Sequence, residues 1–170
     1  MKQKSRKQSN TVQQPLVMND SPVKASLSDG TSWHQMEAVI GKSVAVELRV
    51  LKFKLTTDVI TTTSEFSLLQ YLAGISQLFF LIKVKLQEEI PDIRQRMIKF
   101  LGNSGLEAHR ILFYTCDASK MAMMRQISPQ FYFDDNEEVL AYLRKFIDNA
   151  ICIGSAQTAR KSSFEAFFNE

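Results

Sequence analysis

Apolar residues recur with two different periods from residue 33 onward. Spacings of three and four residues, typical of helices, run over residues 33–40, 64–73, 91–101, 117–126, 136–147 and 162–168. Alternating or continuous apolar runs, typical of strands, cover residues 44–55, 78–84, 111–115, 130–133 and 150–153. Residues suited to helix starts precede several of the helical segments: Ser64, Pro91, Asp117, Asn136 and the pair Ser162 and Glu165.

Strands therefore alternate with helices along the chain, which is the pattern of βαβ units and a parallel sheet. Right-handed crossovers place helices on both faces of such a sheet. We expect the α/β class: a three-layer α/β/α, Rossmann-like domain with a mostly parallel sheet of about five strands. Residues 1–32 are polar and show no sustained period, so we predict a disordered basic tail followed by a single α/β domain at 33–170.

The formal net charge of +3 has a definite location. Within residues 1–32, five cations face only two acids, whereas residues 33–170 carry 16 positive and 16 negative charges. The predicted domain is therefore neutral. Nucleic-acid-binding domains usually present a basic face to phosphate, so we expect no nucleic-acid partner.

The apolar segments also constrain where the protein works. No apolar stretch at the start has the form of a secretion signal. The longest hydrophobic run, residues 71–82, is interrupted and shorter than the roughly 20 residues that a membrane span needs, so we expect no transmembrane segment in this chain. Both cysteines, Cys116 and Cys152, lie in apolar runs and are interpreted as structural thiols of a reducing compartment.

Sites in open α/β sheets lie beyond the carboxyl ends of the strands. Gly41-Lys42-Ser43 resembles the end of a phosphate-binding loop, but it precedes a strand and lacks the first glycine, and no G-x-G-x-x-G occurs. Haloacid-dehalogenase-like phosphatases and receiver domains have this layered topology and need carboxylates after the first strand. We place that strand end at residues 51–55, which contain no acid.

Two features further along the chain are compatible with an enzyme, which is the alternative interpretation. Thr115 follows one strand and Asp134-Asp135 follow another, as in a divergent magnesium-dependent phosphatase of the haloacid-dehalogenase-like kind. We favour a strand terminus and an acidic helix start, because a carboxylate pair without a nucleophile cannot perform the chemistry.

Other candidate residues also favour structural interpretations. Cys116 lacks a base, since His109 lies at the opposite end of its strand, and His34 is expected on the surface. Met121, Met123 and Met124 are interpreted as core, and the phenylalanines of the last helix as docking residues. We expect no catalytic, cofactor-binding or metal-binding residues, and the partner-binding residues stay unknown.

The chain resembles the cytosolic domain of the peroxin-22 family over about residues 33–170. The similarity is carried by short segments in the family's order: Ile111-Leu112-Phe113-Tyr114-Thr115, Met124-Arg125-Gln126-Ile127-Ser128-Pro129, Phe131-Tyr132-Phe133-Asp134-Asp135-Asn136-Glu137-Glu138, Leu143-Arg144-Lys145-Phe146-Ile147 and Ser163-Phe164-Glu165-Ala166-Phe167-Phe168. Gly41-Lys42-Ser43-Val44 is similar to the start of the family's first strand.

This resemblance implies a non-catalytic adaptor without cofactors. Members of the family bind the ubiquitin-conjugating enzyme peroxin-4, hold it at the cytosolic face of the peroxisomal membrane and stimulate it, which supports ubiquitination and recycling of the import receptor. The family usually has a membrane span near its N-terminus, whereas residues 1–32 here are polar and basic. The expected location is therefore the peroxisomal membrane or, without an anchor, the cytoplasm.

Overall fold

The computed structural model describes residues 35–52, 64–102, 104–154 and 162–169. These residues all belong to one compact unit, Ser32–Glu170. The predicted tail at 1–32, together with Trp33 and His34, lies outside the described residues.

Five parallel strands form one sheet in the order β3-β2-β1-β4-β5. The strands are β1 Ser43–Glu47, β2 Gln77–Lys83, β3 Ile111–Tyr114, β4 Phe131–Asp134 and β5 Asn149–Cys152. The predicted parallel sheet of about five strands is confirmed. Because the chain builds outward from β1 first through β2 and β3, and then through β4 and β5, the order reverses at the boundary between β1 and β4.

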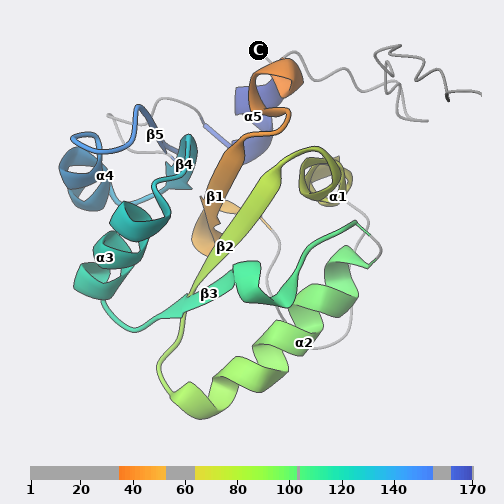
Figure 1. The fold of residues 1–170 in the computed structure, drawn as a ribbon, viewed down its shortest axis with the longest axis vertical. Helices are drawn as coiled ribbons and strands as arrows, with labels where there is room; N and C mark the ends of the chain where they lie inside the picture. Colours follow the sequence, from red (N-terminus) through yellow and green to blue (C-terminus); the bar gives the residue numbers. More distant parts are fainter. Residues whose placement is uncertain (1–34, 53–63, 103, 155–161, 170) are drawn as a thin grey trace, which may run out of the picture. The chain divides into compact units, whose positions relative to one another are not determined.

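Helices cover both faces of the sheet, as Figure 1 shows. They are α1 Ser64–Ile75, α2 Ile90–Leu101, α3 Asp117–Ile127, α4 Glu137–Leu143 and α5 Phe164–Asn169. Residues of α1, α2 and α5 pack into one hydrophobic core, and residues of α3 and α4 pack into a second core. The predicted three-layer α/β/α arrangement is therefore confirmed.

The first strand is much shorter than its sequence pattern predicted. It ends at Glu47, and the chain continues as a 3-10 turn, η2 Leu48–Val50. Val44, Ala45, Val46 and Glu47 are all buried, so this central strand is covered on both faces and does not alternate between core and solvent. The prediction of an acid-free end at 51–55 is wrong, because the strand ends in a carboxylate.

Other boundaries shift by a few residues. Cys116, not Asp117, is the residue that precedes α3. Asn136 caps α4 as predicted, but α4 ends at Leu143, so Phe146 lies beyond it and is 46% exposed. At α5 the Ser163 hydroxyl, rather than Ser162, accepts the Ala166 N–H at 3.1 Å.

The last helix docks onto the domain, as the sequence predicted. Phe164 and Phe168 are fully buried, and their rings lie 5.0 Å and 6.0 Å from the ring of Phe133 in β4. The methionines also have the predicted structural role, since Met124 is fully buried and Met121 and Met123 pack against the second core.

Candidate functional site at the carboxyl ends of β1 and β4

Two acidic residues end the adjacent strands at the point where the sheet order reverses. Glu47 is the last residue of β1, and Asp134 is the last residue of β4. The strands pair up to Val46 and Phe133, so both carboxylates follow directly after the last pair. Both side chains are fully buried. This is the edge at which open α/β sheets bind ligands.

An internal ammonium group lies between these two carboxylates. Lys120 in α3 is fully buried, and its Nζ donates to Asp134 Oδ2 at 2.6 Å and lies 3.6 Å from Glu47 Oε2. Asp117 Oδ1, one helical turn earlier, is 3.9 Å from the same nitrogen. Lysine is rarely buried completely unless it is paired, so α3 is fixed to the sheet by charge as well as by packing.

Two tyrosines complete the buried part of the site. The Tyr114 hydroxyl donates to Glu47 Oε2 at 2.7 Å, and the Tyr132 hydroxyl donates to Asp134 Oδ2. Burial, together with the adjacent carboxylate, raises the pKa of both phenols far above the usual range. Both hydroxyls therefore stay protonated and act as hydrogen-bond donors.

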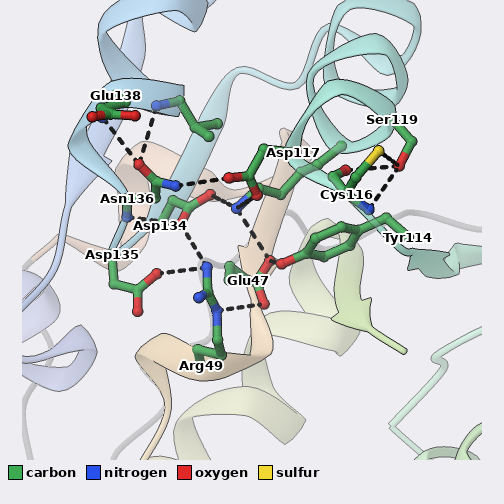
Figure 2. A network of polar contacts seen from close by, with 12 residues as sticks. Glu47, Arg49, Tyr114, Cys116, Asp117, Ser119, Asp134, Asp135, Asn136 and Glu138 are labelled. Atoms are coloured by element: carbon green, nitrogen blue, oxygen red, sulfur yellow. Dashed lines mark hydrogen bonds and ion pairs between the residues drawn. The ribbon is translucent and has the colours of Figure 1, made fainter. Parts of the chain in front are cut away.

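A second cation approaches from the solvent side. Arg49 projects from η2, and its side chain is 44% exposed. Its NH2 group lies 3.0 Å from Asp135 Oδ1 and 3.9 Å from Asp134 Oδ1, while its Nε lies 3.5 Å from Glu47 Oε1. Figure 2 shows the guanidinium group between the carboxylates of these strand ends.

We call this group of contacting side chains the strand-end ion cluster: Glu47, Arg49, Tyr114, Lys120, Tyr132, Asp134 and Asp135. It contains three carboxylates and two cations. Burial raises the pKa of Glu47. Burial also raises the pKa of Asp135, and a hydrogen bond with Asp134 is the second cause of that increase. In both cases burial, which disfavours the charged form of a carboxyl group, is the main cause.

Asn136 connects the cluster to the beginning of α4. Its N–H donates to Asp134 Oδ1 at 3.0 Å, and its Nδ2 donates to Asp117 Oδ2 at 3.2 Å. Its Oδ1 accepts the N–H groups of Glu138 and Val139 as the cap of α4 (Figure 2). Both oxygens of Asp134 are therefore engaged by protein donors.

The remaining residues considered from the sequence lie apart from this cluster or have other roles. His109 is exposed in the turn η4 Ala108–Arg110 before β3, and Cys116 follows β3, so the two lie at opposite ends of the strand as predicted. The interpretation of Cys116 as a structural thiol is wrong, since its side chain is exposed, whereas Cys152 is buried as expected; both are free thiols.

Glu47, Arg49, Lys120 and the two tyrosines are site residues that the sequence pattern did not predict. One signal was available: Glu47 directly follows the apolar run Val44-Ala45-Val46. An acid immediately after a buried parallel strand marks the edge where sites occur.

Within the residues described, no helix is both long and apolar enough to cross a bilayer. The family described as Peroxisome biogenesis protein 22, Haloacid dehydrogenase-like domain, matches residues 32–167 of the chain. The chain belongs to this family. Membership gives the protein a role in peroxisome biogenesis and agrees with the Rossmann-like parallel sheet. No curated protein matches the chain.

The haloacid dehydrogenase-like fold raises the question of a magnesium ion at the strand ends. Carboxylate oxygens bind Mg²⁺ at about 2.0–2.1 Å in an octahedral arrangement. Here the Lys120 ammonium and the Arg49 guanidinium contact the carboxylates that would be ligands. In the part of the chain that the structure describes, no three His, Cys, Asp or Glu side chains are grouped to hold a metal ion. The residues present do not fit Mg²⁺.

Proposed function

We propose that the protein is a non-catalytic adaptor that binds and stimulates a ubiquitin-conjugating enzyme of the peroxin-4 type. This activity would support ubiquitination and recycling of the import receptor at the cytosolic face of the peroxisomal membrane. The observation that carries the proposal is the family match over residues 32–167. The strand-end ion cluster supports the non-catalytic part, because its acids are engaged by internal donors.

Glu47 bears on the alternative of a magnesium-dependent phosphatase, because such an enzyme needs a carboxylate at the end of the first strand. A carboxylate does end the first strand, so the sequence-based objection to an enzyme no longer applies. Glu47 is fully buried, however, and its Oε2 accepts the Tyr114 hydroxyl. A nucleophile must reach the reacting atom of its substrate, and a buried carboxylate held by a phenol and an ammonium does not. The geometry favours the adaptor.

An exposed aromatic and cationic surface is the region we propose for partner contact. We call it the α3–α4 surface: Arg125, Tyr142, Lys145 and Phe146. The Arg125 guanidinium lies 4.8 Å from the Phe146 ring centroid and donates to the Tyr142 hydroxyl at 3.2 Å. The Lys145 Nζ lies 5.8 Å from the centre of the Tyr142 ring.

Such a surface matches the residues that dominate protein–protein affinity, since arginine and aromatic side chains are enriched in interface centres. The described partners of its two cations are aromatic rings and a hydroxyl, so both charges are available to acidic groups. We expect the partner to present an apolar contact bordered by carboxylates.

Isothermal titration of the full chain with the peroxin-4-type enzyme of the same organism tests the proposal. We expect saturable binding, and faster ubiquitin discharge from the charged enzyme. A ubiquitin-conjugating enzyme of another pathway is the matched control. Absence of binding at tens of micromolar would refute the adaptor. Hydrolysis of a generic phosphoester that is lost in Asp135→Asn would instead favour the phosphatase.

The α3–α4 surface has its own test. Phe146→Ala and Arg125→Glu should weaken binding by about tenfold or more each, because central aromatic and arginine residues at hot spots contribute about 2 kcal/mol or more, and about 1.4 kcal/mol is a factor of ten in affinity. Ile98→Ala is the matched control, since Ile98 is also partly exposed, at 38%, but lies on α2. Undiminished binding by both variants would place the contact elsewhere without affecting the adaptor proposal.

A further inference from the structure

Three carboxylates from two adjacent strand ends converge on one guanidinium group. Glu47 Oε1, Asp134 Oδ1 and Asp135 Oδ1 lie 3.5, 3.9 and 3.0 Å from the nearest nitrogens of Arg49. These acids come from β1, from β4 and from the residue that follows β4. Oxygens grouped in this way at a strand-end edge are the ligand type that hard divalent cations bind.

A buried carboxylate oxygen without a hydrogen bond also faces the Arg49 guanidinium. Glu47 Oε1 is buried and receives no hydrogen bond, although the rest of this carboxylate is held by Tyr114. The charge that faces this oxygen is the Arg49 guanidinium, at ion-pair distance. A buried carboxylate oxygen in this condition requires a cation close by, because its desolvation is otherwise uncompensated.

We propose that the Arg49 guanidinium is a built-in replacement for a divalent cation at this edge of the sheet. It supplies positive charge to the three carboxylates and occupies the space in which Mg²⁺ or Mn²⁺ would gather them. Lys120 supplies the second positive charge from the buried side. The wild-type cluster therefore binds no divalent cation, because Arg49 and Lys120 already provide the positive charge that its carboxylates need.

The charges of the cluster indicate that removal of the Arg49 guanidinium creates a site for a divalent cation. Without the guanidinium, Asp135 loses its cation, and Glu47 and Asp134 are left with the Lys120 ammonium group, which also lies near Asp117. Their excess negative charge then attracts a divalent cation, and the exposed position of Arg49 gives that cation a path from solvent. The variant gains an ion site that the natural protein excludes.

Manganese titration of the full chain, followed by the loss of the free Mn²⁺ electron paramagnetic resonance signal, tests this inference. We expect Arg49→Ala to bind one Mn²⁺ at least about tenfold more tightly than the wild type. Arg49→Lys keeps the positive charge, so this variant should bind Mn²⁺ no more tightly than the wild type. Arg96→Ala is the matched control, because it removes a similarly exposed arginine, at 42%, from α2 and should leave the Mn²⁺ affinity unchanged.

A double variant tests whether Asp135 provides the Mn²⁺ affinity that Arg49→Ala gains. Arg49→Ala combined with Asp135→Asn should return Mn²⁺ binding to the wild-type level, and Mn²⁺ should raise the melting temperature of Arg49→Ala only. If Arg49→Ala does not fold, Arg49→Gln provides the same neutral test. Tight Mn²⁺ binding by the wild type, or no gain on neutralising Arg49, would overturn the inference. Partner binding enters none of these measurements, so the adaptor proposal stands or fails separately.

Discussion

Lys120→Met should strongly destabilise the domain. Lys120 is fully buried, with its Nζ 2.6 Å from Asp134 Oδ2, 3.6 Å from Glu47 Oε2 and 5.1 Å from the centre of the Tyr114 ring. Methionine keeps most of the apolar stem in place but removes the charge. The buried carboxylates then lose the cation that offsets their desolvation.

The expected magnitude follows from this geometry. Two unit charges about 4 Å apart interact by about 4 kcal/mol at an effective dielectric constant of about 20. Breaking a buried pair by removing one partner costs about 3–5 kcal/mol, because an uncompensated charge stays behind. For a domain of this size, that loss lowers the melting temperature by roughly 12–20 °C.

Urea unfolding followed by far-ultraviolet circular dichroism measures this loss at neutral pH. Lys145→Met is the matched control: Lys145 is exposed, and removing it should change the free energy of unfolding by at most about 0.5 kcal/mol. The double variant Lys120→Met/Asp134→Asn should be more stable than Lys120→Met alone, because the stranded charge is removed as well. A cost below about 1 kcal/mol for Lys120→Met, or no recovery in the double variant, would refute the buried ion pair.

Three further predictions follow from individual residues. The folded-state pKa of Glu47 lies above its unfolded value because of burial, so stability decreases as the pH rises above about 4.5 and Glu47 ionises in the folded protein. Glu47→Gln should flatten this decrease in the free energy of unfolding by urea, and an unchanged slope would contradict this assignment. Iodoacetamide should modify Cys116 at least about tenfold faster than Cys152, because the Ser119 backbone N–H lowers the pKa of the exposed Cys116 thiol, whereas burial raises that of Cys152; equal rates, followed by mass spectrometry, would count against it. Phe164→Ala should cost about 3–5 kcal/mol in urea unfolding, and the exposed Phe146→Ala far less; similar losses would show that α5 does not complete the core.

The order of helices and strands could be predicted because most elements have one clear period. Pro91 lies in the first turn of α2, Gly102 caps the end of that helix, and Asn136 caps α4, so local signals and final structure agree. The first strand was misjudged because its last residue, Glu47, is a charged side chain that tertiary contacts bury. The alternating pattern of apolar and polar residues continues past Glu47 into residues that form a 3-10 turn.

The strand-end ion cluster could not be predicted for a related reason. A lysine in a polar helical segment normally points to solvent, and complete burial of Lys120 depends on acids 14 and 73 positions away in the chain. Arg49 likewise acquires its role only where β1 and β4 become neighbours. Residue types suggest candidates, whereas strand order determines which of them meet.

The cluster also bears on how an adaptor could work without chemistry of its own. Helix α3 has two distinct faces: Lys120 and Met124 are buried, while Arg125 belongs to the exposed α3–α4 surface. A binding surface is more precise when rigid elements carry it, and an ion pair that fixes one face of α3 also fixes the direction of the other. The strand-end edge, where related topologies bind ions, would then serve partner binding by holding this helix in place.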